Sequence, residues 1–78
     1  MIYVFGKNDC ITCNITKTLL TTKKVEFEYY DIGEVYEDKE LMSMRNKIKK
    51  QATKEQGKDY ALPLISKDET LITLDDLL

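Results

Sequence analysis

The sequence predicts an α/β fold of the order βαβαββ(α), in which a four-stranded mixed sheet carries two helices and a truncated C-terminal helix. Three observations lead to this prediction. Short β-prone runs alternate with longer stretches of helical periodicity in the first two thirds of the chain. Two more β-prone runs then follow each other directly, and the last residues resemble the first turn of a helix. With 78 residues, we expect a single domain over residues 1–78.

Two strands are predicted in the first third of the chain. Residues 2–5 form a continuous apolar run that Gly6 ends, which is typical of a strand buried on both faces at the centre of a sheet. Residues 25–29 alternate apolar and acidic side chains, as in a strand with one buried face. We expect this second strand at a sheet edge, after a right-handed crossover.

The first helix is predicted from apolar residues at four-residue spacing. This stripe consists of Ile11, Ile15, Leu19 and Leu20. Asp9, or Asn8 beside it, can cap the start of the helix by accepting a backbone hydrogen bond. Cys10 and Cys13 therefore fall in its first turn.

A long second helix is predicted from Tyr36 to about Gln56. Its apolar stripe consists of Leu41, Met44 or Arg45, Ile48 and Ala52. Acidic residues gather at its start and lysines toward its end, which complements the helix dipole. We expect the helix to end at Gly57.

A hairpin is predicted to complete the sheet. Residues 62–65 and 70–73 are short β-prone runs, and the polar residues 66–69 between them have the length of a turn. Pro63 stands at the start of the first of these runs. Its plainest role is to begin an edge strand, where its missing N–H costs nothing.

The composition argues against several classes of protein. There are 12 Lys and Arg residues against 14 acidic ones, so the chain has no excess positive charge for a nucleic-acid backbone. Its apolar runs are far shorter than the roughly 20 residues that cross a bilayer, and no signal-peptide pattern opens it. We expect a cytoplasmic monomer that binds neither nucleic acid nor membrane.

Cys10 and Cys13 are the only cysteines of the chain and form a CxxC motif. A disulfide across so short a loop stabilises little, which disfavours a structural role. Paired cysteines also form half of many zinc sites, but the chain has no further cysteine and no histidine. A CxxC pair at the start of a helix in a βαβ unit is typical of a thioredoxin-like redox centre. We expect no bound metal or cofactor.

The position of Cys10 favours it as the nucleophile. Thiol–disulfide exchange needs a thiolate, whereas a free cysteine with a pKa of about 8.5 is mostly protonated at neutral pH. Unpaired N–H groups at the helix start stabilise a Cys10 thiolate, and Cys13 can donate its S–H toward it. Lys7 adds positive charge nearby, while Asp9 acts in the opposite direction. We expect Cys10 to attack a substrate disulfide and Cys13 to resolve the mixed disulfide.

The CxxC motif, residues 19–24, the Leu62-Pro63 step and Asp75-Asp76 together resemble a glutaredoxin of the thioredoxin fold. The resemblance covers essentially the whole chain and is closest to the small phage glutaredoxins, also called phage thioredoxins. It implies a nucleophilic first cysteine, a resolving second cysteine and a cis Leu62-Pro63 bond. It further implies a thiol–disulfide oxidoreductase of the cytoplasm, which is the host cytoplasm if a phage encodes the chain. Such an enzyme reduces ribonucleotide reductase and small disulfides with electrons from glutathione or a thioredoxin reductase.

The same resemblance implies a set of residues that bind glutathione or a protein disulfide. The set consists of Lys7, Thr12, Leu62, Pro63, Asp75 and Asp76. Lys7 would meet a glutathione carboxylate, Leu62 and Pro63 would pair with its backbone, and the acidic pair would meet its γ-glutamyl end. Plain helix capping is the alternative for Asp75 and Asp76.

Two departures from the family pattern leave other functions open. Ile72-Thr73 stand where glutaredoxins usually carry Gly-Gly, and Thr12 stands where many carry an aromatic residue. One alternative is a hydrogen donor with weak glutathione binding that depends on thioredoxin reductase. A second, of another class, is a binding module in which Cys10 of two copies shares an iron–sulfur cluster with glutathione.

Overall fold

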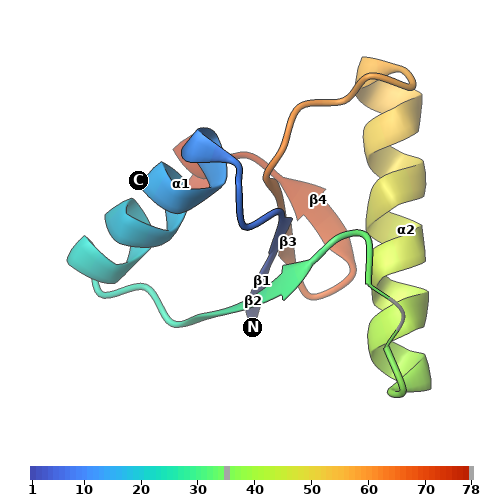
Figure 1. Cartoon of the computed structure of the whole chain (residues 1–78), viewed down its shortest axis with the longest axis horizontal. Coiled ribbons are helices and arrows are strands. Elements are labelled where there is room, and N and C mark those ends of the chain that lie inside the picture. The colour runs from blue at the N-terminus through green and yellow to red at the C-terminus, as the bar shows by residue number, and fades with distance from the viewer. Residues whose placement is uncertain (35, 78) are drawn as a thin grey trace.

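The computed structural model describes residues 1–34 and 36–77, and two helices flank its central sheet (Figure 1). Helix α1 (Ile11–Thr22) covers one face of the sheet, and α2 (Lys39–Gln56) covers the other. A short 3-10 helix, η1 (Leu74–Leu77), follows the last strand and packs on the α1 side. This arrangement confirms the predicted thioredoxin-like α/β fold. Leu78, the last residue of the predicted helical turn, lies outside the described residues.

The sheet has the spatial order β2-β1-β3-β4 and is mixed. It consists of β1 (Ile2–Gly6), β2 (Phe27–Asp31), β3 (Leu64–Lys67) and β4 (Thr70–Ile72). β1 runs parallel to β2 and antiparallel to β3, and β4 runs antiparallel to β3. The predictions of a central first strand and an edge second strand are confirmed.

β2 starts two residues later than the alternating pattern predicts. Val25 donates its backbone N–H to the carbonyl of Leu20 at 3.0 Å, so it still belongs to the end of α1. Lys24 adopts the left-handed conformation, with φ at 59°, and turns the chain toward the sheet. Pairing with β1 can begin only after this turn, at Phe27.

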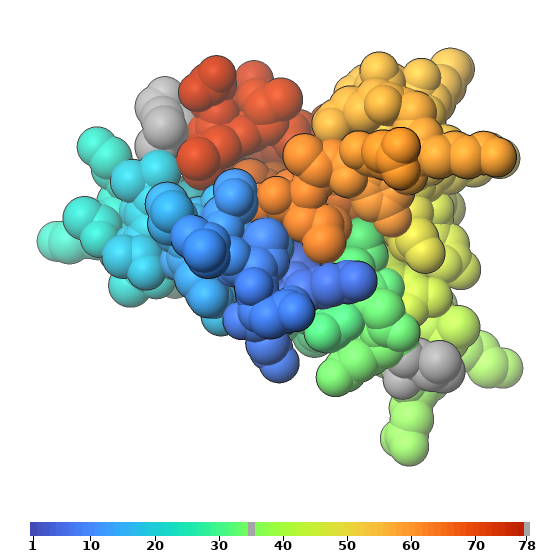
Figure 2. Space-filling view, turned by 45° about the horizontal axis from the view of Figure 1, so that its top comes forward, coloured from blue at the N-terminus to red at the C-terminus, as the bar shows by residue number. Residues whose placement is uncertain are grey.

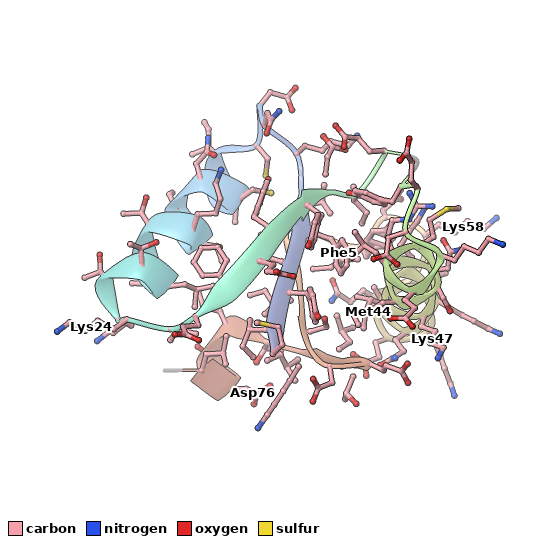
Figure 3. All side chains as sticks on the ribbon, turned by 90° about the horizontal axis from the view of Figure 1, so that it is seen from below. Phe5, Lys24, Met44, Lys47, Lys58 and Asp76 are labelled. Carbon is pink, nitrogen blue, oxygen red and sulfur yellow. The ribbon has the colours of Figure 1, made fainter. Side chains whose placement is uncertain are left out.

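β1 contributes residues to two hydrophobic clusters, one on each face of the sheet, because its side chains alternate between the two faces. Val4 faces α1 and packs with Leu20 and Ile65. Phe5 faces α2, and Figure 3 shows it on the side of the sheet where Met44 lies. Val4 and Phe5 are both fully buried, which explains why this strand reads as a continuous apolar run.

The predicted buried stripe of α1 is confirmed at Leu20 but wrong at Ile11 and Ile15. Ile11 and Ile15 are 76% and 60% exposed, whereas the buried residues of α1 are Cys13, Thr16 and Leu20. Thr16 can be buried because its hydroxyl donates to the Thr12 carbonyl at 2.9 Å. The face that carries Cys13 is therefore turned to the sheet, and the predicted isoleucines point to solvent.

α2 is close to its prediction and differs mainly at its start. The helix begins at Lys39 rather than Tyr36, because the Asp38 carboxylate caps it by accepting from the N–H groups of Glu40 and Leu41. Ile48 is buried as predicted, and the helix ends at Gly57, whose φ of 86° suits glycine. Among the described helices, none combines the length and apolarity needed to cross a membrane.

The predicted hairpin is present with a shorter turn. Residues 68 and 69 form the turn, while Ser66 and Lys67 belong to β3. Pro63 precedes β3 and does not begin it. The edge-strand interpretation of Pro63 is wrong, because β3 lies between β1 and β4.

Candidate active site

The two cysteines lie where β1 gives way to α1, and their environments differ. Cys10 is the N-cap residue of α1 and is partly exposed, whereas Cys13 is fully buried. Both are free thiols. The backbone N–H of Cys13 donates to Sγ of Cys10 at 3.2 Å. The sulfur of Cys10 therefore occupies the place of a capping oxygen, and the prediction that Asn8 or Asp9 caps this helix is wrong.

A tight backbone turn fixes this arrangement. The N–H of Cys10 donates to the Lys7 carbonyl at 3.2 Å, which folds the loop after β1 back on itself. The N–H of Asn14 then donates to the Cys10 carbonyl at 3.1 Å, which is the first hydrogen bond of the helix. Cys10 is thus held at the helix start from both sides.

Hydrogen bonding lowers the pKa of the Cys10 thiol. The largest cause is the hydrogen bond from the Cys13 side chain, followed by the backbone N–H of Cys13 and, more weakly, that of Thr12. Burial and the charge of Asp9 act in the opposite direction. The predicted opposition of Asp9 is confirmed, and the stabilising groups are supplied by the first turn of α1.

Burial has the opposite effect on Cys13 and raises the pKa of its thiol. The hydrogen bond and the charge of Cys10 raise it further, since a proton on Cys13 is what stabilises the Cys10 thiolate. A backbone hydrogen bond from Lys7 and the side chain of Tyr29 lower it. The pair therefore holds one accessible sulfur that favours the thiolate and one buried sulfur that favours the thiol.

Gly6 and Tyr29 belong to this site, although the sequence pattern gives Gly6 only as the end of the first strand and Tyr29 only as part of the second. A Cβ on Gly6 would lie 2.6 Å from Sγ of Cys13 and 2.8 Å from the Tyr29 hydroxyl oxygen. Only a glycine leaves room for both atoms at the end of β1. A glycine at the end of a central strand, four residues before Cys10, was the available signal for this close approach.

A groove beside the cysteines gathers three of the predicted binding residues. Thr12, Leu62 and Pro63 line a hollow of about 240 Å³ together with Thr16 and Thr73. The Leu62-Pro63 peptide bond is cis, as the family resemblance implies. In Figure 2 the orange segment that contains these two residues lies beside the blue start of α1. The groove therefore connects the helix start to the segment before β3.

Lys7 lies in a second, more polar hollow. This hollow has a volume of about 490 Å³, and its lining includes Lys7, Lys49, Lys58 and Tyr60. Leu62 lines both hollows, so the two are neighbours. The structure thus brings Lys7 near Leu62 with two further lysines that the sequence pattern does not single out.

Asp75 and Asp76 are set apart from these hollows. The described lining of the groove reaches Leu74 and includes neither aspartate. Asp76 accepts hydrogen bonds from the backbone N–H and the hydroxyl of Thr73, at 2.9 and 3.1 Å. In Figure 3 Asp76 lies far from the loop between β1 and α1. Helix capping, one of the two predicted roles, is therefore the observed role of Asp76.

The described part of the chain has no cluster of side chains suited to bind a metal ion. Within residues 1–34 and 36–77, no three cysteine, aspartate or glutamate side chains gather where an ion could bind.

The fold and the paired thiols together define a class of protein. A partly exposed cysteine at a helix start, with a buried cysteine one turn later, is the arrangement that thiol–disulfide exchange requires. This fold and site are those of the class of thiol–disulfide oxidoreductases with a thioredoxin-like fold.

Comparison with known proteins identifies the family. The family model described as Glutaredoxin matches residues 2–57, and the chain belongs to the glutaredoxin family. Its structure is similar to that of a glutaredoxin (grx-1) from Archaeoglobus fulgidus, with a TM-score of 0.57 and 20% identity, covering 97% of this chain and 79% of that chain. No curated protein sequence matches the chain significantly. The family prediction is confirmed, and the closeness to phage members stays a prediction.

Proposed function

We propose that this glutaredoxin reduces disulfides of other proteins by a two-thiol mechanism in which Cys10 attacks and Cys13 resolves. The observation that carries the proposal is the 3.2 Å hydrogen bond from the Cys13 N–H to Sγ of Cys10, within a pair whose thiol pKa values shift in opposite directions. The exposed sulfur is the one that favours the thiolate. The buried sulfur is protected from solvent until the first reaction has occurred.

The cycle conserves electrons over two exchanges. The Cys10 thiolate attacks a substrate disulfide, a bond forms between Cys10 and one substrate sulfur, and the other substrate sulfur leaves and takes up a proton. Cys13 then loses its proton and attacks Sγ of Cys10, which releases the second substrate sulfur as a thiol. The substrate gains two electrons, and the protein keeps a Cys10–Cys13 disulfide that a donor must reduce.

The groove and the lysine-lined hollow are the proposed binding surface for the substrate. The Thr12, Leu62 and Pro63 groove offers an extended lining beside Cys10, which suits a peptide or glutathione backbone. Lys7, in the adjacent hollow, suits a carboxylate. We propose ribonucleotide reductase as the protein substrate, which would place the chain in deoxyribonucleotide synthesis as a cytoplasmic monomer.

The electron donor is proposed to be glutathione, with thioredoxin reductase as a second candidate that one observation favours. Asp76 is already engaged by Thr73, and Ile72 and Thr73 both line the groove where smaller residues would leave more room for a ligand. This crowding weakens the case for a glutathione γ-glutamyl group at Asp75-Asp76. A donor that docks as a protein needs no such pocket.

Two thiol variants test the mechanism. Cys13→Ser is expected to accumulate a mixed disulfide on Cys10, whereas Cys10→Ser is expected to lose turnover with protein disulfides. Intact-mass spectrometry after reaction with a disulfide substrate measures the first, and an NADPH-coupled assay measures the second. Full activity of Cys10→Ser would show that the nucleophile is wrongly assigned.

The same coupled assay separates the donors. Reduction supported by glutathione and its reductase, but not by thioredoxin reductase, is the expected result for the first candidate. The reverse pattern identifies the second.

A further inference from the structure

The hydroxyl of Tyr29 is a buried polar group that the mechanism has not yet used. Tyr29 lies on β2, and its hydroxyl oxygen is inaccessible to solvent. Among residues 1–34 and 36–77, no group stands at the distance and angle of a hydrogen bond to this hydroxyl. A buried hydroxyl without a partner is unfavourable, and native structures tolerate few of them. The groups around the hydroxyl therefore indicate which atom it binds during the reaction.

The sulfur of Cys13 is a reactive atom close to this hydroxyl. Both the Tyr29 oxygen and Sγ of Cys13 lie within 3 Å of the point where a Cβ on Gly6 would stand, at 2.8 and 2.6 Å. The two atoms therefore share the small space above Gly6. No backbone group competes for the hydroxyl in that space within the described residues.

The ring of Tyr29 is held in place from α1. Nζ of Lys17 lies 4.2 Å from the ring centroid, which is the geometry of a cation–π contact. A cation on the ring face draws electron density from the phenol and makes its hydroxyl a better hydrogen-bond donor. The other charged groups that act on the phenol are the two cysteines and Asp31, and all three disfavour its ionisation.

The phenol is consequently a donor and not a base. Burial, more than the nearby charges, raises the pKa of Tyr29 to about 12, so the hydroxyl keeps its proton at neutral pH. A neutral phenol next to a sulfur stabilises the thiolate in preference to the thiol, because hydrogen bonds to charged acceptors are the stronger ones.

We propose that the Tyr29 hydroxyl donates a hydrogen bond to Sγ of Cys13 and stabilises its thiolate in the resolving step. The inference rests on the proposed two-thiol mechanism. Once Cys10 is in a mixed disulfide, it no longer needs the Cys13 proton, and that proton leaves for solvent. The Cys13 sulfur then bonds to Cys10, the bond between Cys10 and the substrate breaks, and the substrate sulfur departs with the electron pair and takes up a proton. Tyr29 keeps its own proton throughout.

The size of the effect follows from two opposing trends. The pKa of Cys13 lies above its ordinary value, so losing the hydrogen bond would lower the thiolate fraction at neutral pH by about tenfold or more. A thiolate with a higher pKa is more nucleophilic, but only with a slope of about 0.4–0.5, which recovers about half of the loss on a logarithmic scale. Tyr29→Phe should therefore slow resolution by about three- to tenfold.

Reaction with one equivalent of the aromatic disulfide 5,5′-dithiobis(2-nitrobenzoate), followed by stopped-flow absorbance, separates the two steps. The first coloured thiolate is released when Cys10 attacks, and the second when Cys13 resolves. In Tyr29→Phe the first phase should keep its rate, while the second slows by about three- to tenfold at pH 7. The second phase should also reach its half-maximal rate at a higher pH than in the wild type.

Tyr30→Phe is the matched control, because its hydroxyl is on the same strand but donates to the exposed Glu28 at 2.9 Å. A merely structural role for Tyr29 would lower the melting temperature without moving the pH profile of the second phase. An unchanged second phase in Tyr29→Phe, in rate and in pH profile, overturns the inference. Failure of the wild type to release a second thiolate contradicts the two-thiol mechanism itself, which is a different result.

Discussion

The two long helices begin in different ways. At α2 the Asp38 carboxylate accepts from two backbone N–H groups, at 2.9 and 3.2 Å. At α1 the capping atom is Sγ of Cys10, which accepts from the Cys13 N–H at 3.2 Å. A carboxylate is already charged and holds its helix start permanently. A sulfur is a good cap only as a thiolate, so the same hydrogen bond that secures α1 also prepares the nucleophile.

The largest effect is expected where the start of α1 meets the sheet. Gly6→Ala would place a methyl group 2.6 Å from Sγ of Cys13, and the strand backbone at Gly6 cannot move away without disturbing its pairing. We expect the free energy of unfolding to fall by about 1–3 kcal/mol, as for an overpacked core. Chemical denaturation followed by circular dichroism measures this loss.

Gly33→Ala is the control for Gly6→Ala. A Cβ on Gly33 would come no closer than 3.3 Å to the Asp31 carboxylate, at an exposed position. Its unfolding free energy should stay within about 0.5 kcal/mol of the wild type. Equal stability of both variants would contradict the close packing above Gly6.

An intermediate effect is expected at the start of α2. Asp38→Ala removes both capping hydrogen bonds and should lower the free energy of unfolding by about 1 kcal/mol. The pKa of the Cys10 thiol should not change, because the groups that lower it all lie in α1.

Cys10→Ser is the reciprocal variant. Serine is a good N-cap, so stability should be kept while activity is lost. If Asp38→Ala altered the reactivity of Cys10, the two helix starts would not be independent.

The smallest effect is expected beside the nucleophile itself. Asp9 raises the pKa of Cys10 by its charge, so Asp9→Asn should lower that pKa further and move the midpoint of the alkylation profile to lower pH. Iodoacetamide labelling of Cys10 across a pH series, read by mass spectrometry, measures the midpoint. The shift should shrink in high salt, because exposed charges are screened, and Asp9→Glu should show none. A midpoint that rises in Asp9→Asn would show that Asp9 acts through structure instead of charge.

Most of the fold was predictable because its signals are local. The order of elements, the central β1, the edge position of β2 and the stop at Gly57 follow from periodicity and turn residues. The buried face of α1 did not follow, because Ile11 and Ile15 outweigh Cys13 and Thr16 in any count of apolar side chains. Small residues that satisfy their own polar groups can be buried in place of larger ones, and only the packing partner decides which face turns inward.

The site was predictable to the extent that its residues are neighbours in sequence. The motif itself predicts the two thiols and the direction in which the pKa of Cys10 shifts. Tyr29 approaches Cys13 through the parallel pairing of β1 with β2, so its role depends on tertiary contacts. Asp76 shows the opposite case, because an acidic residue three positions after Thr73 fits a local cap and a ligand contact equally well.

The sulfur cap of α1 also links helix stability to oxidation state. A thiolate is a charged acceptor at the helix start, whereas a sulfur in a disulfide is neutral and a weaker one, so oxidation of Cys10 removes part of what holds the first turn. By thermodynamic linkage, whatever free energy the helix start gains from the thiolate favours the reduced protein over the oxidised one by the same amount. The hydrogen bond to Sγ of Cys10 therefore affects both the oxidation state of the protein and the order of the first turn of α1.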